Sequence, residues 1–248
     1  MSDTSPLLTL VIPAYNEEER LPVTLPKVID FVSQQPYATE VILVNNNSKD
    51  RTRAIADEFA TELPFFRVLD EPTQGKGAAV RSGVLAAHGE YIFLADADFS
   101  MPVAEINKFL PPQLGDYDVA IGSREVEGAV RYDEPEYRHI MGRIFNLIVR
   151  LIAVPGFQDT QAGFKCFRRQ AALNVFADQT IDGWAFDVEV LFIAQQRHLK
   201  IVEVPIAWHY MANSRISPLR DSFNMVVQVL KIRWNGLRGL YDQTHSPA

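Results

Sequence analysis

The chain has 248 residues, 47% of them hydrophobic, which is enough for a large buried core in one or two domains. Its formal net charge of −7 argues against general nucleic-acid binding, because that function needs a broad basic surface. A single cysteine excludes an internal disulfide, and no signal segment or membrane-spanning apolar run is found, so we expect a globular cytoplasmic protein.

Short apolar runs and helical patterns alternate through the first half of the chain. The apolar runs end in polar or turn residues and predict strands at Leu7–Ile12, Glu40–Asn45, Phe66–Leu69, Tyr91–Ala95 and Val119–Gly122. Helical spacing predicts helices between them, at Leu21–Gln34, Arg51–Leu63, Gly77–Ala87 and Val103–Leu110. Such alternation indicates an α/β fold whose mostly parallel central sheet is flanked by helices on both faces.

The second half of the chain is less regular. Its patterns predict a long amphipathic helix at Glu136–Ala153, a strand near Phe164–Phe167, a helix near Phe186–Arg197, a strand at Ile201–Trp208 and a last helix at Leu219–Leu237. Because no repeat or flexible linker divides the sequence, we expect one domain over residues 1–242, followed by a disordered tail at 243–248.

Two aspartates follow the predicted strand that ends at Ala95. Asp96 and Asp98 are too close to remain charged without a cation nearby, and a divalent metal with substrate phosphates would meet that need. A polar turn in which Asp98 caps the next helix is the alternative. Ligands bind beyond the carboxyl ends of strands in sheets of this kind, which favours the metal site.

Glycines surround a lysine at the start of the next predicted helix pattern. In Gly75-Lys76-Gly77 they would let backbone N–H groups approach an anion at the helix N-terminus. The stretch is not a P-loop, because the spacing and the Ser or Thr after the lysine are absent. An ordinary helix-start turn with a solvated lysine remains the alternative.

Several motifs together resemble a known family. Their order is that of family 2 glycosyltransferases with the GT-A fold, and two later motifs are similar to the subgroup that glycosylates polyprenyl phosphates, the dolichyl-phosphate β-glucosyltransferases among them. The motifs are Val11-Ile12-Pro13-Ala14-Tyr15-Asn16-Glu17, Ser48-Lys49-Asp50-Arg51-Thr52, Gly75-Lys76-Gly77, Asp96-Ala97-Asp98, Gly122-Ser123-Arg124, Asp159-Thr160-Gln161-Ala162-Gly163-Phe164-Lys165 and Trp184-Ala185-Phe186-Asp187-Val188-Glu189.

This resemblance implies an inverting transfer of a hexose, expected to be glucose, from a UDP-sugar to a polyprenyl phosphate. It implies Mg²⁺ or Mn²⁺ as cofactor, with Asp98 as a metal ligand, Asp96 near the metal and the ribose, and Asp187 and Arg124 in the catalytic set. The residues that it implies for the nucleotide sugar are Pro13, Tyr15, Glu17, Asn46, Lys76, Asp96 and Ala97.

Arginines are the expected ligands of the acceptor phosphate, because the guanidinium fork matches phosphate geometry. The resemblance points to Arg124 and Arg138, and Arg215 is a further candidate, as are Arg131 and Arg143. A solvated or ion-paired surface residue is the alternative for each of the last three.

The sequence departs from the family at three places. Asn45-Asn46-Asn47-Ser48 stands where Asp-Asp-Gly-Ser is usual, so Asn46 could accept the uracil N3–H only through its amide oxygen. Ser100 replaces the metal-binding glutamine of mannose synthases. Gly142 and His209 replace their acceptor-side serine and arginine, which favours a glucosyltransferase over a mannose synthase.

Apolar and basic residues recur on different faces of two predicted helices. Ile140, Ile144 and Leu147 lie on one face of the first, and Arg143 and Arg150 on another. Such a helix can lie in a membrane interface or pack on the core. Peripheral membrane contact is therefore one prediction. A soluble acceptor, and a nucleotide-sugar-binding protein without turnover, remain the alternatives to the polyprenyl phosphate transferase.

Overall fold

One mixed sheet forms the centre of the molecule. The computed structural model describes residues 5–211 and 218–242. Within them a seven-stranded sheet has the order β3-β2-β1-β4-β7-β5-β8, and every neighbouring pair is parallel except those that β7 makes with β4 and β5. The strands are β1 Leu8–Ala14, β2 Thr39–Asn45, β3 Phe66–Asp70, β4 Tyr91–Leu94, β5 Val119–Ser123, β7 Lys165–Arg168 and β8 Ile201–Pro205.

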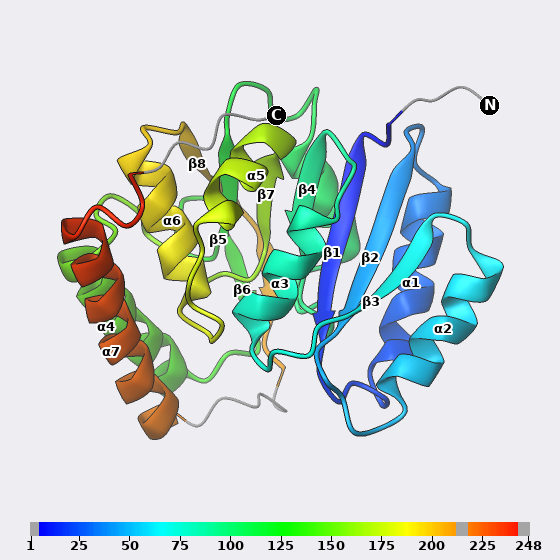
Figure 1. Cartoon of the computed structure of the whole chain (residues 1–248), viewed down its shortest axis with the longest axis horizontal. Helices are drawn as coiled ribbons and strands as arrows, with labels where there is room; N and C mark the ends of the chain where they lie inside the picture. Colours follow the sequence, from blue (N-terminus) through cyan, green and yellow to red (C-terminus); the bar gives the residue numbers. More distant parts are fainter. Residues whose placement is uncertain (1–4, 212–217, 243–248) are drawn as a thin grey trace.

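Helices cover both faces of this sheet (Figure 1). One face packs on α1, α2 and η1, and the other on α3, α5 and α6, so each strand buries alternate side chains in two separate cores. In β1, Leu10 and Ile12 join the first core, whereas Val11 joins the second. The helices are α1 Leu21–Ser33, α2 Thr52–Glu62, α3 Lys76–Leu85, η1 Val103–Phe109, α4 Glu136–Ile152, α5 Arg169–Ala177, α6 Phe186–Gln196 and α7 Pro218–Leu237.

The sheet confirms the predicted α/β architecture and its mostly parallel pairing. Along β1 the strand order reverses, since β2 follows on one side and β4 on the other. The residues after β1 and β4 therefore emerge side by side at the switch point, where α/β sheets bind ligands. The antiparallel β7 begins at the same edge, because Lys165 pairs with Leu94 near the end of β4.

Some predicted elements differ from the observed ones. The prediction of one strand at Ile201–Trp208 is wrong, because Ile206 separates β8 from β9 Ala207–His209, which pairs with β6 Val130–Tyr132 in a second, two-stranded sheet. The segment at 103–109 is a 3₁₀ helix rather than an α-helix. Helix α5 and strand β6 were not predicted, and both are short, at nine and three residues.

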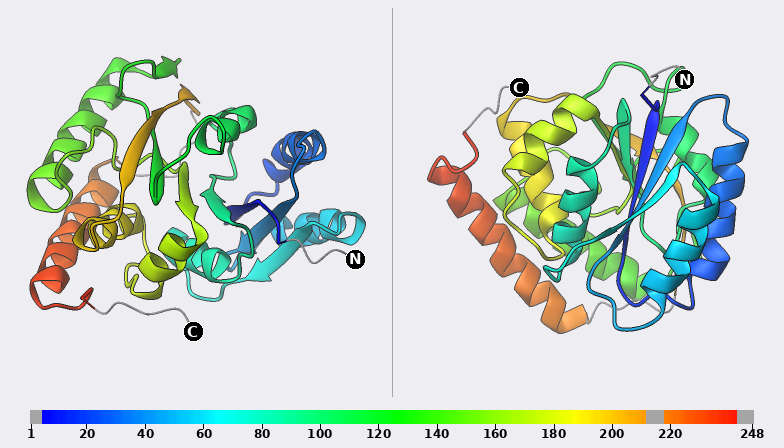
Figure 2. Two further views of the ribbon diagram at one scale, coloured as in Figure 1. Left: turned by 90° about the horizontal axis from the view of Figure 1, so that it is seen from above. Right: turned by 45° about the vertical axis from the view of Figure 1, so that its right-hand side comes forward.

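Helices α4 and α7 lie side by side at the end of the molecule opposite α1 and α2 (Figures 1 and 2). Their packing buries few α4 side chains, Asn146 and Val149 among the described ones. The apolar stripe of α4 stays exposed instead, with Ile144 56% and Leu151 78% accessible. The alternative that this stripe packs on the core is therefore wrong. Over the described residues, no helix has both the length and the apolar character to cross a membrane.

Candidate functional site

The loops after β1 and β2 are joined by side-chain hydrogen bonds. The backbone N–H of Asn16 donates to Ser48 Oγ at 3.0 Å, and the Asn16 side-chain oxygen accepts from the N–H of Lys49 at 2.7 Å. The N–H of Glu17 donates to Thr52 Oγ1 at 2.6 Å. The motif that begins at Ser48 thus holds the loop that carries Tyr15 and Glu17 at the switch-point edge, just after Pro13 near the end of β1. In this loop Asn16 adopts a left-handed φ of 51°, which asparagine tolerates well.

Asp96 and Asp98 emerge from the end of β4 at this edge. Burial and the Asp96 carboxylate raise the pKa of Asp98, while the Ser100 N–H, which donates to Asp98 Oδ1 at 3.0 Å, acts in the opposite direction. The Asp96 carboxylate rests on Gly163, where an added Cβ would come within 2.2 Å of Asp96 Oδ2. The missing side chain at 163 therefore leaves the space that the Asp96 carboxylate occupies.

Lys76 supplies the positive charge beside these carboxylates. Its Nζ lies 2.5 Å from Asp96 Oδ1 and 5.4 Å from the centre of the Trp184 ring. Burial alone would lower the pKa of Lys76, but the charges of Asp96, Asp187 and Asp98 raise it above its ordinary value. Four predicted site residues from three different segments are thus brought together around one ammonium group.

Two N–H groups at the start of α3 are bound within the protein. The N–H groups of Gly77 and Ala78 both donate to the carbonyl of Asp182, at 2.7 and 3.2 Å. A Cβ at residue 77 would meet the Ile181 carbonyl oxygen at 2.3 Å, so the glycine permits close packing of the 181–182 backbone. These two N–H groups are therefore not offered to an anion, and the turn places Lys76 beside Asp96.

Asp187 lies at the start of α6 and pairs with a buried lysine. Lys165 Nζ is 2.5 Å from Asp187 Oδ1 and donates to the Ala162 carbonyl at 2.6 Å, with no exposed surface on the lysine side chain. Burial raises the pKa of Asp187, and the charges of Lys165 and Lys76 oppose that effect. Asp187 therefore belongs to the same electrostatic network as Lys76.

The Asn46 amide is already engaged with the protein. Its nitrogen donates to the carbonyls of Glu71 and Thr73, at 3.2 and 2.7 Å, and its oxygen accepts from the Gly75 N–H at 2.8 Å. These bonds hold the segment that leads from β3 to α3. An asparagine can make all three of these bonds without bringing a charge into the site.

Arg124 follows β5 and is held by Asp159 through both carboxylate oxygens. Nε lies 2.7 Å from Oδ2 and Nη2 lies 3.0 Å from Oδ1. Burial raises the pKa of Asp159, but the Arg124 charge and its hydrogen bonds outweigh that effect and hold the value at about 2. The Arg124 guanidinium also lies 5.3 Å from the centre of the Trp208 ring. The Arg124 guanidinium thus forms its two-point contact with a carboxylate of the protein.

The other predicted arginines have different partners from Arg124. Arg138, on α4, lies 5.4 Å from the centre of the Tyr210 ring, and its Nε is buried without a hydrogen-bond partner. Arg131 and Arg143 both contact Glu125. Arg215 and the tail at 243–248 lie outside the described residues.

The aspartate pair is a suitable donor set for a hard divalent cation, because a cation would offset the burial and the repulsion by Asp96 that together raise the pKa of Asp98. Within residues 5–211 and 218–242, no group of three or more His, Cys, Asp or Glu side chains is placed to hold a metal ion. A cation bound to this pair would therefore complete its coordination with substrate oxygens and water.

Three contributors to the site were not predicted: Asp159, Gly163 and Lys165. All belong to the motif 159–165, which was read as a family signature without roles for its members. The sequence did contain a signal for Asp159 and Lys165. Both are charged, and they stand at the two ends of a short segment that leads into an apolar strand. Such charges must find partners when the strand is buried, and here the partners are Arg124 and Asp187.

The sequence is similar to known transferases over most of its length. Residues 9–176 match the family described as Glycosyl transferase family 2. The chain is 34% identical over 254 residues to dolichyl-phosphate beta-glucosyltransferase ALG5C of Trichomonas vaginalis, covering 96% of this chain and 75% of that protein. It is 32% identical over 249 residues to dolichyl-phosphate beta-glucosyltransferase of Homo sapiens, covering 94% of this chain and 77% of that protein.

The fold is also similar to that of a solved enzyme. Glucosyl-3-phosphoglycerate synthase from Mycobacterium tuberculosis, in complex with Mn²⁺, UDP-glucose and phosphoglyceric acid, superposes with a TM-score of 0.63. The identity is 19%, and the match covers 97% of this chain and 81% of that one. At this identity the likeness concerns the fold.

Proposed function

The chain belongs to glycosyl transferase family 2 and has the GT-A fold, and from this premise we propose that it transfers glucose from UDP-glucose to a polyprenyl phosphate with inversion. The observation that carries the proposal is the similarity to dolichyl-phosphate beta-glucosyltransferases along nearly the whole chain, 96% and 94% of it for the two relatives above. The gathering of Lys76, Asp96, Asp98 and Asp187 at the sheet edge supports it.

In the proposed reaction a phosphate oxygen of the acceptor forms a bond to the anomeric carbon of glucose. The bond from that carbon to the β-phosphate oxygen of UDP breaks, and UDP leaves with the electron pair. An acceptor phosphate is already anionic at neutral pH, so a strong general base is not required. The main demand on the protein is to hold the two anionic substrates in line and to stabilise the charge that grows on UDP.

We assign the residues roles that fit this demand. Asp96 and Asp98 would hold Mg²⁺ or Mn²⁺, which when bound supplies positive charge at the donor diphosphate. Lys76 orients the Asp96 carboxylate, and Asp187 faces the sugar or the acceptor. Asn46 fixes the 71–75 segment as a wall of the nucleotide pocket. The remaining residues of this pocket are Pro13, Tyr15, Glu17 and Ala97.

The test is transfer of labelled glucose from UDP-glucose to polyprenyl phosphate in the presence of Mn²⁺. Asp98→Ala should nearly abolish transfer while its thermal unfolding temperature stays close to that of the wild type, because Asp98 lies at the site rather than in the core. Asp116→Ala changes an exposed carboxylate just before β5, at the edge of the sheet opposite the site, and is the control that should retain activity. Full activity of Asp98→Ala with added metal would contradict the metal role.

The same assay separates the competing functions. Transfer to a soluble phosphate ester such as 3-phosphoglycerate, with none to polyprenyl phosphate, would favour a soluble acceptor. UDP binding by calorimetry without transfer or slow donor hydrolysis would favour a binding protein without turnover.

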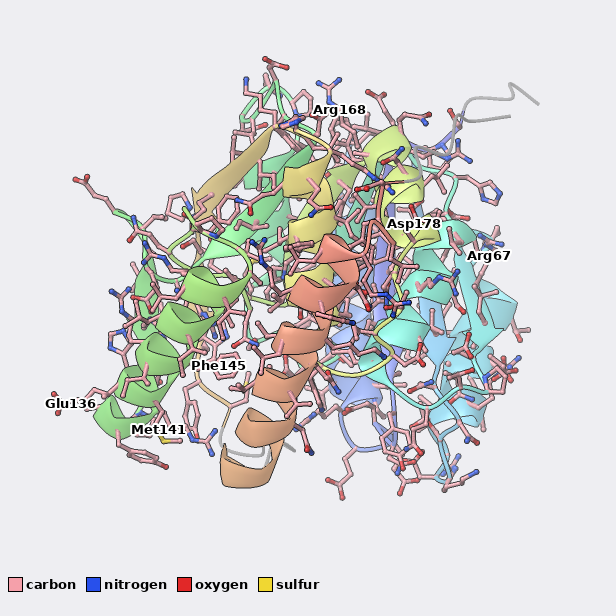
Figure 3. The ribbon with its side chains drawn as sticks, turned by 60° about the vertical axis from the view of Figure 1, so that its left-hand side comes forward. Arg67, Glu136, Met141, Phe145, Arg168 and Asp178 are labelled. Atoms are coloured by element: carbon pink, nitrogen blue, oxygen red, sulfur yellow. The ribbon has the colours of Figure 1, made fainter. Side chains whose placement is uncertain are left out.

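We further propose that the exposed apolar face of α4 and α7 rests on a membrane surface. Large apolar side chains of both helices are accessible, including Leu147 at 53%, Trp234 at 61% and Leu237 at 68%, and basic residues such as Arg143 and Lys231 lie on the same two helices. Figure 3 shows the two helices side by side, with Glu136 and Met141 near one end of α4. Apolar contact plus attraction to anionic lipids would bind such a face peripherally.

Sedimentation with anionic liposomes tests the membrane proposal. The double variant Leu147→Ser and Trp234→Ser should lower the liposome partition coefficient by about tenfold or more, since each change removes apolar burial worth on the order of 1 kcal/mol. Val23→Ser is the matched control, because Val23 is 59% exposed on α1 at the other end of the molecule. Equal binding of all three proteins would contradict the proposal.

A further inference from the structure

A single carboxylate is surrounded by two arginines and a histidine beside the site. Glu125 directly follows Arg124, and its side chain is 12% exposed. Its Oε1 pairs with the Arg131 guanidinium and lies 3.3 Å from His139 Nε2, and its Oε2 lies 3.0 Å from Arg143 Nη1. Strand β6 supplies Arg131 and helix α4 supplies the other two, so the three side chains converge on Glu125 from two elements.

The three side chains have enough donors for a larger anion than a carboxylate. Glu125 offers two oxygens to them, whereas a phosphate monoester offers three terminal oxygens. Arginine forks bind phosphate in two-point contacts, and two arginines are present here. Arg131 also pairs with Glu134, and among the described residues His139 and Arg143 pair with Glu125.

This seat is connected to the aspartate pair through a short series of contacts. The guanidinium groups of Arg124 and Arg131 lie 5.3 and 5.9 Å from the centre of the Trp208 ring. Trp208 Nε1 donates to Ser100 Oγ at 3.0 Å, and the Ser100 N–H donates to Asp98. One tryptophan and one serine thus connect the Glu125 cluster to the carboxylates assigned to the donor.

The seat also borders the apolar face that we assign to the membrane. His139 and Arg143 belong to α4, and the neighbouring Ile140 and Ile144 of that helix are 53% and 56% exposed. An isoprenyl phosphate would place its phosphate among Arg131, His139 and Arg143, while its chain follows the exposed apolar side chains of α4. A soluble phosphate ester would contact only Arg131, His139 and Arg143.

We propose that Glu125 is an internal anion that occupies the acceptor-phosphate seat formed by Arg131, His139 and Arg143, and that the acceptor phosphate binds by displacing it. The inference rests on the proposed function, since it names the acceptor site of that reaction. It differs from the sequence-based assignment of the phosphate to Arg124, Arg138 and Arg215, and the Arg124 guanidinium is already paired with Asp159. Glu125 keeps Arg131, His139 and Arg143 together until the acceptor arrives.

Calorimetric titration with farnesyl phosphate, without donor, tests the displacement directly. Glu125→Gln should bind it about three- to tenfold more tightly than the wild type, because a competing ion pair is removed while the side-chain shape is kept. Arg143→Gln should bind it more weakly. Glu136→Gln is the control, because it removes the same charge from the exposed start of α4, where Glu136 forms no ion pair with Arg131, His139 or Arg143. This variant should bind farnesyl phosphate as the wild type does.

Two further ligands identify the chemistry that is recognised. Farnesol lacks the phosphate, so its binding should not respond to Glu125→Gln. If the seat recognises only the phosphate group, Glu125→Gln should also bind 3-phosphoglycerate more tightly than the wild type does. The difference in affinity between farnesyl phosphate and 3-phosphoglycerate then measures the contribution of the lipid chain.

The outcomes separate this inference from the proposed function. If Glu125→Gln melts like the wild type but binds farnesyl phosphate no more tightly, or no differently from Glu136→Gln, the displacement proposal is overturned. If it binds more tightly and no glucose is transferred to any phosphate acceptor, the seat stands and the proposed activity fails. If transfer occurs, the KM for the acceptor should fall in Glu125→Gln, and an increase would overturn the inference.

Discussion

Replacing Asp159 with asparagine should destabilise the protein strongly, because Asp159 is the buried partner of Arg124. The Asp159 side chain is 5% exposed and both its oxygens accept hydrogen bonds from the guanidinium. It also accepts the backbone N–H of Arg124 at 3.1 Å, which joins the end of β5 to the segment before β7. Asparagine preserves the shape but removes the charge, so Arg124 would be left without its anionic partner.

The magnitude follows from the pKa of Asp159. The value falls from an ordinary 3.8 to about 2, a difference of about 1.8 units that corresponds to about 2 kcal/mol of stability at neutral pH. Removing one partner of a buried pair costs about 3–5 kcal/mol when the other charge stays buried. We therefore expect a loss of about 2–4 kcal/mol, or about 5–10 °C in unfolding temperature for a chain of this size.

The pH dependence gives a second check. Because the folded-state pKa is lowered, the stabilisation is fully present above the unfolded value of 3.8 and is lost as pH falls through about 2. About half of it should remain at pH 3. Urea unfolding of the wild type and Asp159→Asn at pH 7, 5 and 3 measures this, and the difference between the two proteins should narrow at pH 3.

Asp116→Asn is the matched control for the lead prediction. Asp116 also pairs with a cation, Lys200, at 2.7 Å, but its side chain is 90% exposed, so the substitution should not measurably change stability. Equal stability of the two variants at pH 7 would refute the reasoning, as would a difference between wild type and Asp159→Asn that does not change with pH.

Two further predictions concern the site itself. Gly163→Ala should lower kcat/KM for UDP-glucose by about 10- to 100-fold with little change in melting temperature, since the new methyl group displaces the Asp96 carboxylate. Gly115→Ala, where the added methyl group meets open space before β5, is the control and should match the wild type in the same kinetic assay. Asp187→Asn should cost about 3–5 kcal/mol in urea unfolding because it leaves the Lys165 ammonium buried and unpaired, and adding Lys165→Met should restore stability but not transfer; a stable single variant would contradict this account.

Much of the fold could be predicted from local patterns. The alternation of apolar runs and helical spacing specified the α/β class, and β1 to β5 lie within about two residues of the predicted strands. Elements without a strong local pattern were missed or merged. Strand β6 has a partner far away in the sequence, β9, and a three-residue strand is stabilised by that pairing rather than by its own sequence.

The site could be predicted in part. The residues at the ends of β1 and β4 were placed at one edge, and the structure gathers Lys76, Asp96, Asp98 and Asp187 there. Sequence reasoning left an ion pair open as the alternative for Arg131 and Arg143, but it could not name the carboxylate partner of either residue or that of Arg124. The Asp159 bond to Arg124 and the Glu125 bonds to Arg131 and Arg143 join segments whose distance in space no spacing rule gives.

By itself, the sequence determined the strand ends, the aspartate pair after β4 and the amphipathic character of α4, because these depend on neighbouring residues along the chain. The tertiary structure alone decided which charges pair, that the N–H groups at the start of α3 are taken by Asp182, and that the apolar stripe of α4 remains exposed. The physical reason is that pairing and burial depend on which surfaces meet in space. Residues such as Glu125 and Arg143 come together only when β5 and α4 are packed into one molecule.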